Sequence, residues 1–532
     1  MSKQHKASRT LAGIAGIVAA ATLISKIFGL VRQQAIAAAF GVGAVFDAYT
    51  YAYVIPGFLL ILLGGINGPF HSAIVSVIAK RDKAEAAPLV ETITTLVGGV
   101  LLLVTVGLII FADFFIHLVG PGLNQTTHAI AVQQLRIMAP MAVLAGLIGI
   151  GFGTLNAANQ YWLLSLSPVF SSITVIGGLS ILAMQLKTQI TTSQYAQLGG
   201  LILAWGTLAG AILQWLVQLV AQSRAGMGKF RLRFDFNQPG VQEVTKIMLP
   251  ATFSSGMMHI NLYTDYFFAS SIAGAAAAFN YSNLLVQTPL GIISNVILLP
   301  LLPMLSRLAE PADWVNLKVR IRQGLILTAL TMLPLGALMV ALAVPIVRVV
   351  YERYAFNKAA SHLVASVLVA YGVGMFFYLG RDVLVRVFYA LGDGNTPFRI
   401  SMANIFLNAL LDYILVKPFG APGLILATAG VNLVSMLMLL WLLDRKLNGL
   451  PWREWTLPIL SLIGGSFVTG LTSWGTLWGC QQILGTEGFL VQLLQLCLSG
   501  LVGISVFALI TARLNLPEVD FLVYRLRQRF VK

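Results

Sequence analysis

The chain is poor in charge and in cysteine for its length. Only 10% of its 532 residues are Asp, Glu, Lys or Arg, and it has two cysteines, Cys480 and Cys497. Hydrophobic residues make up 58% of the sequence and the mean hydropathy is +0.84, a composition that excludes an ordinary soluble domain. The cysteines favour two separate packed or lipid-facing thiols over a disulfide or a metal site.

The chain also lacks a polar insertion long enough to fold as a soluble domain. Its longest polar break, residues 222–246, is about 25 residues long. The sequence contains no Walker A motif, no HExxH motif and no GxSxG motif. ATP-driven pumping by this chain therefore has no motif to support it, and we expect a protein that is not an enzyme.

What the chain does contain is about fourteen hydrophobic stretches joined by mostly short polar breaks. The bilayer core takes about 20 apolar residues per helix, and a segment such as Leu89–Phe111 has that length. The runs are too long and too apolar for barrel strands. The sequence thus predicts an all-α polytopic membrane protein with about 14 transmembrane helices. The predicted spans are residues 12–39, 46–79, 89–112, 130–155, 165–186, 198–221, 243–268, 275–305, 323–347, 362–389, 398–416, 421–443, 455–477 and 487–512.

Basic residues are distributed unevenly between the two ends of these spans. With the N-terminus inside, the cytoplasmic loops collect about 24 Lys and Arg, against about 5 outside. The tail Arg525–Lys532 falls on the cytoplasmic side, whereas Arg348, Arg353 and Lys358 fall outside. We therefore interpret the net charge of +15 as a topology signal, with both termini cytoplasmic, and expect no nucleic-acid partner.

The order of features in residues 130–182 returns in residues 364–416. Each segment has an apolar helix, a small-residue turn, a proline (Pro168 or Pro397) and a second apolar helix. Parallel repeats of this kind are a common transporter architecture, with the substrate cavity between two lobes. The alternative is that apolar helices resemble one another by composition. The predicted organisation is an N-terminal lobe of six helices (1–221), a cytoplasmic linker (222–242), a C-terminal lobe of six helices (243–446), and two further helices with a basic tail (447–532).

Charged residues inside a membrane helix are costly and by default mark a function. In the first span, Ser25, Gly29 and Arg32 share one helix face, with Lys26 on its flank. Gly29 leaves room for close approach, and two cations that face a cavity would suit a phosphate or pyrophosphate. The alternative is that Lys26 and Arg32 extend to the membrane interface or pair with Asp47.

A second polar group predicts a cation site. Carboxylate, amide and hydroxyl oxygens on adjacent buried helices suit a hard cation such as sodium. Two buried carboxylates without a cation would have to bind protons instead. The alternatives are hydrogen bonds between helices through the amides, or an ion pair between Asp412 and Lys417. The polar residues are Asp265 in the seventh span, Asn404, Asn408 and Asp412 in the eleventh, and Thr428 and Asn432 in the twelfth.

Three further features are predicted to be structural. His71 and His259 have no metal-ligand spacing, so we expect packed or hydrogen-bonding histidines. Arg381 and Asp382 lie within one helix turn, which favours a local ion pair. Pro56 and the glycines that follow it are predicted to break the second span, where such a break lines a cavity or allows bending.

The same residues resemble a known family, the MurJ/MviN lipid II flippases. The resemblance covers nearly the whole chain. It implies the fold of the multidrug/oligosaccharidyl-lipid/polysaccharide exporter superfamily, in which two six-helix lobes form a central cationic cavity and helices 13 and 14 form a groove for the polyprenyl tail. It rests on Ser25–Arg32, Phe40–Gly43 and Asp47–Tyr49 in the first two helices, and on Asn156-Ala157, Ser167-Pro168, Phe388–Asp393 and Thr396-Pro397 at two cytoplasmic turns.

This resemblance implies a flippase that moves the lipid-linked peptidoglycan precursor, lipid II, from the inner to the outer leaflet of a bacterial inner membrane by alternating access. Lys26 and Arg32 match basic cavity residues of the family, and Asp47 matches its acidic residue early in helix 2. With their neighbours Ser25 and Gly29, these three residues form the predicted substrate site.

The resemblance also implies the coupling ion and the partners. Asp265, Asn408, Asp412 and Thr428 match positions proposed as a sodium site in some members, so we expect Na⁺ or H⁺ as the coupling ion and no other cofactor. The expected partners are lipid II or a related polyprenyl-pyrophosphate glycolipid, membrane lipid, and cell-wall synthesis enzymes.

Two alternatives to this function stay open. The family's arginines near Leu60 and at Leu284 are replaced here, which favours an exporter of another polyprenyl-linked glycan or amphipathic molecule. The basic cytoplasmic loops would also suit a non-transporting scaffold that recruits cell-wall enzymes.

Overall fold

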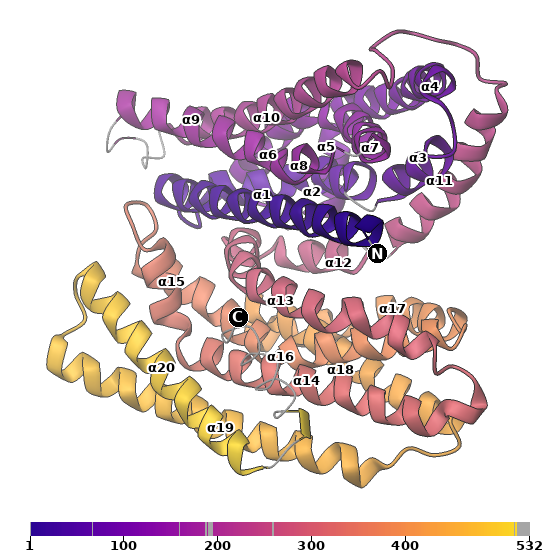
Figure 1. The fold of residues 1–532 in the computed structure, drawn as a ribbon. Helices are drawn as coiled ribbons and strands as arrows, with labels where there is room; N and C mark the ends of the chain where they lie inside the picture. Colours follow the sequence, from indigo (N-terminus) through magenta and orange to yellow (C-terminus); the bar gives the residue numbers. More distant parts are fainter. Residues whose placement is uncertain are drawn as a thin grey trace. The chain divides into compact units, whose positions relative to one another are not determined.

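The computed structural model describes residues 2–65, 68–158, 160–186, 189, 195–257, 260–514 and 517–518. The regular secondary structure of these residues is entirely helical (Figure 1). His259 and the basic tail Arg525–Lys532 lie outside the described residues. The all-α prediction is therefore confirmed.

The chain packs as two compact units. Unit 1 comprises Met1–Ala277 and Arg353–Phe356, and unit 2 comprises Ala278–Glu352 and Asn357–Lys532. Unit 1 contains α1 (Ser2–Phe40), α2 (Ala44–Gly64), α3 (Pro69–Ile78), α4 (Lys83–Ile110), α5 (Ala112–Val119), α6 (Gln125–Met138), α7 (Met141–Ala157), α8 (Tyr161–Leu166), α9 (Pro168–Leu186), α10 (Ala196–Arg224), α11 (Pro239–Met257) and α12 (Ile260–Ala269). Helix α13 (Ala275–Ser306) starts at the end of unit 1, and unit 2 continues with a short 3-10 helix (Pro311–Asp313), α14 (Trp314–Ala341), α15 (Ala343–Tyr351), α16 (Lys358–Ala390), α17 (Asn395–Phe419), α18 (Ala421–Lys446), α19 (Trp452–Leu484) and α20 (Phe489–Arg513).

These helices follow the predicted spans closely. Among the described residues, 11 helical stretches are long and apolar enough to cross a membrane, or 12 if α6 and α7, bent by 43°, form one span. The predicted spans 12–39 and 243–268 coincide with α1 and with α11 and α12, which are not among those 11. The chain is a multi-pass membrane protein.

The packing units and the predicted lobes are different divisions of the chain. Helix α11 packs on α3 and α4 within unit 1, although residues 243–268 belong to the predicted C-terminal lobe. Because those lobes were inferred from a repeat in the sequence, they stay a prediction.

The predicted break in the second span lies after Pro56 rather than at it. Helix α2 continues through Pro56 and ends at Gly64. Gly65 and Gly68 then adopt extended backbone conformations, and Pro69 begins α3. A proline inside a helix removes only one backbone hydrogen bond, whereas two glycines followed by a proline remove the preference for helix over several residues.

Close helix approach holds the core of unit 1 together. Along α7, Gly146 faces Val97 and Leu101 of α4, and Gly149 lies against the backbone carbonyl of Leu63. Glycines at a helix contact let the two backbones approach closely, and in a membrane such close packing, rather than the hydrophobic effect, drives helix association. In unit 2, α14 and α16 also approach closely at glycines, where Gly336 lies against the backbone of Gly372.

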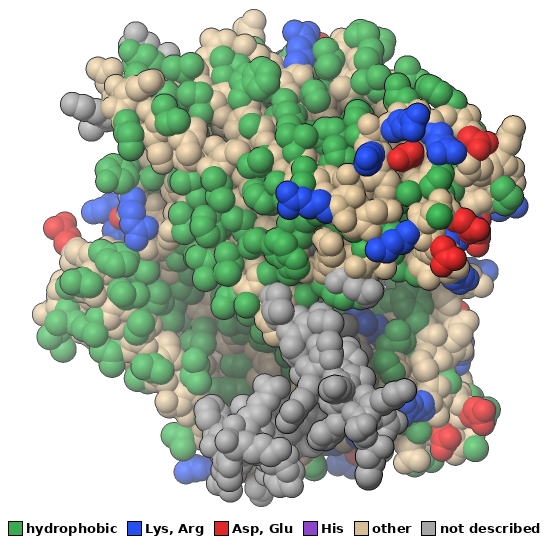
Figure 2. Space-filling view, turned by 45° about the horizontal axis from the view of Figure 1, so that its top comes forward, with side chains coloured by type: hydrophobic (Ala, Val, Ile, Leu, Met, Phe, Trp, Pro, Cys, Tyr) green, Lys and Arg blue, Asp and Glu red, His purple; other side chains and the backbone are tan. Residues whose placement is uncertain are grey.

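The exposed surface is strongly apolar. Figure 2 shows wide areas of hydrophobic side chains interrupted by few Lys and Arg. Leu103 of α4, Phe406 of α17 and Leu490 of α20 are 74%, 79% and 76% exposed. A soluble protein rarely exposes such contiguous apolar area, so this surface suits contact with lipid tails.

Candidate functional site

The predicted substrate face lies on α1, which packs against α8 and α9. Ser25, Gly29 and Arg32 are half-buried, whereas Lys26 is exposed. A methyl group at Gly29 would meet no atom within 4 Å in the described part of the chain. The face beside Arg32 is therefore open on the side of Gly29, and the glycine is not required for packing within unit 1.

The guanidinium of Arg32 is only partly satisfied. Its Nη1 atom donates a long hydrogen bond of 3.4 Å to Ser171 Oγ on α9. Among the described residues, its Nε atom is buried and has no hydrogen-bond partner. A buried donor without a partner is costly, so Arg32 keeps hydrogen-bonding capacity that the described residues do not satisfy.

Asp47 forms hydrogen bonds with backbone N–H groups rather than an ion pair with Lys26 or Arg32, the alternative that the sequence offered. Its Oδ2 accepts the backbone N–H of Gly274 at 2.6 Å, and its Oδ1 accepts that of Ala277 at 2.9 Å. The described residues show no ion pair between Asp47 and Lys26 or Arg32. The carboxylate caps the first turn of α13, and any contact of Asp47 with substrate stays a prediction.

The predicted cation ligands fall in both units. Asp265 is buried on α12 in unit 1. Asn408 and Asp412 are fully buried on α17 in unit 2, where Asn408 Nδ2 donates to Asp412 Oδ2 at 2.9 Å. Thr428 is half-buried on α18, which packs against α17. A carboxylate, an amide and a hydroxyl on two packed helices are a donor set that fits a hard cation.

Asn404, one turn before Asn408 on α17, makes a contact with the neighbouring helix. Asn404 Oδ1 accepts a hydrogen bond of 2.9 Å from Ser435 Oγ on α18. This is the interhelical hydrogen bond that the sequence offered as an alternative, and it holds for Asn404. Lys417, the other alternative partner of Asp412, places its ammonium 5.1 Å from the centre of the Tyr413 ring.

The other polar side chains that the sequence singled out make hydrogen bonds or ion pairs. His71 Nε2 lies 2.7 Å from Asn156 Nδ2, so the ring nitrogen accepts a hydrogen bond from the amide. Arg381 and Asp382 form an ion pair of 3.9 Å. Cys480 and Cys497 are free thiols. Among the described residues, no three His, Cys, Asp or Glu side chains group as metal ligands.

Two polar contacts were missed from the sequence. Asp393, in the turn after α16, accepts a hydrogen bond of 2.6 Å from Lys446 at the end of α18. Glu91 and Thr95 of α4 accept backbone N–H groups of the linker between α10 and α11. The sequence signal for the linker contact was the alternation of charged and apolar residues in 229–236.

The sequence of this chain matches one protein family and its curated members over most of its length. The family described as "Lipid II flippase MurJ" matches residues 36–499. A "Probable lipid II flippase MurJ" of Synechocystis sp. is 59% identical over 532 residues, covering 100% of this chain and 99% of that protein.

Two solved structures share the fold. One, titled "Lipid II flippase MurJ, inward closed conformation", has a TM-score of 0.74 at 23% identity and covers 93% of this chain and 98% of its own. The other, an inward-facing multidrug resistance MATE family transporter of the MOP superfamily, has a TM-score of 0.58 at 16% identity over 82% of this chain and 98% of its own.

Proposed function

This chain belongs to the lipid II flippase MurJ family, and on that basis we propose that it moves lipid II from the inner to the outer leaflet of a bacterial inner membrane by alternating access. The headgroup of lipid II carries a pyrophosphate, which needs cationic donors in the low-dielectric interior of a membrane protein. The polyprenyl tail is apolar and would stay in lipid. Catalysis of a covalent step has no part in this proposal.

The observation that carries the proposal is the state of Arg32. Its buried Nε has no hydrogen-bond partner among the described residues, and the adjoining face at Gly29 is open. A guanidinium can donate two parallel hydrogen bonds to phosphate oxygens, which a single ammonium cannot do. In this proposal Arg32 binds the pyrophosphate and Ser25 lines the same face. Exposed Lys26 attracts the anion from the flank.

We further propose that Asn408, Asp412 and Thr428 hold the coupling ion, Na⁺ or H⁺. A monovalent cation there would neutralise the Asp412 carboxylate in its buried setting. The contribution predicted for Asp265 stays a prediction. Moving one charge through 100 mV corresponds to about 2.3 kcal/mol, enough to bias a two-state transporter strongly.

The experiment that tests the substrate site is complementation of a bacterium depleted of its own flippase. Arg32→Ala should be expressed in the membrane but fail to restore growth and exposure of lipid II at the outer face. Arg32→Lys should restore little, because it keeps the charge but loses the bidentate geometry. Arg224→Ala, which changes an exposed arginine at the end of α10, is the matched control and should restore both. Full rescue by Arg32→Ala would remove the role given to Arg32.

A further inference from the structure

The linker between α10 and α11 has a regular pattern of its own. Residues 229–236 read Lys-Phe-Arg-Leu-Arg-Phe-Asp-Phe, so charged and apolar side chains alternate. The segment is not helical, and its side chains are mostly exposed. Phe230, Leu232 and Phe234 are 57%, 69% and 69% exposed. A loop in water would not normally present three large apolar side chains, so this exposure requires an explanation.

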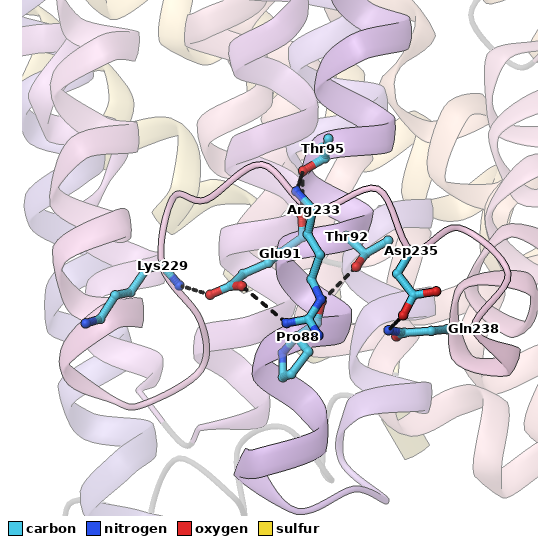
Figure 3. Close-up of polar contacts among 8 residues, drawn as sticks. All are labelled: Pro88, Glu91, Thr92, Thr95, Lys229, Arg233, Asp235 and Gln238. Atoms are coloured by element: carbon cyan, nitrogen blue, oxygen red, sulfur yellow. Dashed lines mark hydrogen bonds and ion pairs between the residues drawn. The ribbon is translucent and has the colours of Figure 1, made fainter.

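Side chains of α4 hold the linker in place (Figure 3). Glu91 Oε1 accepts the backbone N–H of Lys229 at 3.0 Å, and Thr95 Oγ1 accepts that of Arg233 at 3.0 Å. The guanidinium of Arg233 lies 3.9 Å from Glu91 Oε2. Asp235 accepts a hydrogen bond from Gln238. These contacts satisfy polar groups of an irregular segment that would otherwise need water.

The docked linker lies beside a membrane-spanning helix rather than beyond its end. Thr95 is six residues inside the predicted span 89–112, which corresponds to about 9 Å along the helix axis from the cytoplasmic end of that span. Helix α4 is one of the candidate membrane spans. On its other side the linker contacts α10, where the rings of Phe230 and Trp215 pack edge to face at 5.3 Å between centroids. Irregular backbone at this depth occurs only where the protein supplies its hydrogen bonds, as Glu91 and Thr95 do here.

An open groove of about 530 Å³ adjoins the linker at this level. Its lining is mainly apolar and comes from α4, the linker and α11; it includes Leu96, Phe236, Val241, Lys246, Leu249 and Pro250. Helix α11 packs on both α3 and α4, and the three helices lie at the same end of unit 1 in Figure 1.

The charged residue among those that line the groove is Lys246. Glu91 is engaged by the linker, and Glu243 forms an ion pair of 2.9 Å with Arg81. Within the described part of the chain, Lys229, Arg231 and Lys246 take part in no ion pair, and all three are exposed. Asp235 is the linker's one acidic residue in 229–236, and its carboxylate accepts a hydrogen bond from Gln238. An apolar groove beside the predicted cytoplasmic end of a membrane span, with Lys246 in its lining and Lys229 and Arg231 on the adjoining linker, is complementary to a molecule with an apolar chain and an anionic head.

We propose that this groove binds an anionic phospholipid of the bilayer. One acyl chain lies along Leu96, Val241 and Leu249, and the phosphate pairs with the ammonium of Lys246. Lys229 and Arg231 add attraction at the headgroup level, where each basic residue near the surface is worth about a fivefold gain in affinity. Phe230, Leu232 and Phe234 insert at the boundary between headgroups and tails, as aromatic residues do at membrane interfaces.

The test uses the full-length protein in nanodiscs with lipids that carry a photoreactive acyl chain. Phosphatidylglycerol should label residues of 236–250 and Leu96 more strongly than phosphatidylcholine at equal concentration. Lys246→Gln should weaken labelling by phosphatidylglycerol about fivefold, and addition of Arg231→Gln should weaken it about fivefold again. Lys318→Gln, which removes a lysine from unit 2, is the control and should leave the labelling unchanged.

A second variant tests the contribution of the apolar groove separately from that of the basic side chains. Thr245→Trp places a large side chain among the lining residues, and should reduce labelling by both lipids while the thermal midpoint stays unchanged. Equal labelling by the two lipids, or labelling insensitive to Lys246→Gln, would overturn the proposal. A third result would also overturn the proposal: polyprenyl phosphate displaces phosphatidylglycerol from the groove, whereas other phospholipids do not. The groove would then be a site for the substrate's tail. These readouts are independent of transport, which is tested through Arg32.

Discussion

The carboxylate of Asp47 on α2 accepts a hydrogen bond of 2.9 Å from the backbone N–H of Ala277, 230 positions further along the chain. Its other oxygen accepts the N–H of Gly274, whose φ of +79° is a left-handed conformation that favours glycine. The first N–H groups of any helix lack partners within the helix, and an acidic side chain at that end also favours the helix dipole. A residue of α2 therefore completes the start of α13.

We expect Asp47→Ala to destabilise the fold because it leaves two buried N–H groups without an acceptor. The free energy of unfolding should fall by about 1–2 kcal/mol, the usual cost of losing a helix cap. Thermal unfolding of the purified protein in detergent measures this change. Asp113→Ala is the control, since the Asp113 side chain is 76% exposed and should contribute little. An unchanged thermal midpoint for Asp47→Ala would show that the cap is dispensable.

Gly29→Leu should separate folding from transport. The added side chain meets no described atom at its first carbon, so stability should change by no more than about 1 kcal/mol, and helix propensity favours leucine. The same side chain would occupy the open face beside Arg32 and should block rescue of a flippase-depleted strain. Gly149→Leu is the contrasting variant: its side chain would collide with the backbone of Leu63, and it should unfold the protein. Normal transport by Gly29→Leu would place the substrate elsewhere.

Asp412→Asn should abolish stabilisation by sodium. In the wild-type protein, NaCl should raise the thermal midpoint more than choline chloride at equal ionic strength, because a bound ion stabilises the folded state. Asn404→Ala provides a matched control on the same helix. It breaks the hydrogen bond to Ser435 and should lower the midpoint, yet it should keep the response to sodium. A sodium response that survives in Asp412→Asn would argue against the proposed ion site.

Asp393, outside the membrane spans, should make stability depend on pH. Partial burial raises the pKa of Asp393, but hydrogen bonds from Lys446 and Thr396 lower it by more, so its pKa lies below the usual range. A carboxyl group with a depressed pKa in the folded state stabilises the fold above its unfolded pKa, near 3.9, and loses this effect as the pH falls through the folded value.

The corresponding measurement compares wild type with Asp393→Asn across pH. The difference in thermal midpoint should be full near pH 7 and should shrink below about pH 4. Lys446→Gln should reproduce this loss, and combining the two changes should add little further, because both remove the same contact. A difference between wild type and Asp393→Asn that does not vary with pH would contradict the assignment.

Local features of the sequence were enough to predict the helices. Run length and apolar content predicted the spans because a membrane helix satisfies its own backbone hydrogen bonds and needs no distant partner. The helix end after Ala157 and the extended backbone of Gly65 and Gly68 followed from local backbone preferences, although α7 continues through Asn156, which the sequence placed in the turn. At Pro56 a local rule failed, because the helix tolerates the loss of one hydrogen bond there. Helix α13 likewise continues through Pro289, where the sequence also favours a break.

The sequence by itself thus determined the helices, the shared face of Ser25, Gly29 and Arg32, and the polar stripe of α17. Only the tertiary structure decided the partners of these residues. Asp47 caps α13, Asn404 bonds to α18, and Glu91 holds a linker residue 138 positions away. The physical reason is that a side chain's polar type and helix face follow from local sequence. Whether its hydrogen bonds are satisfied, as for Asp47, or left open, as for Arg32 Nε, depends on segments brought together by packing.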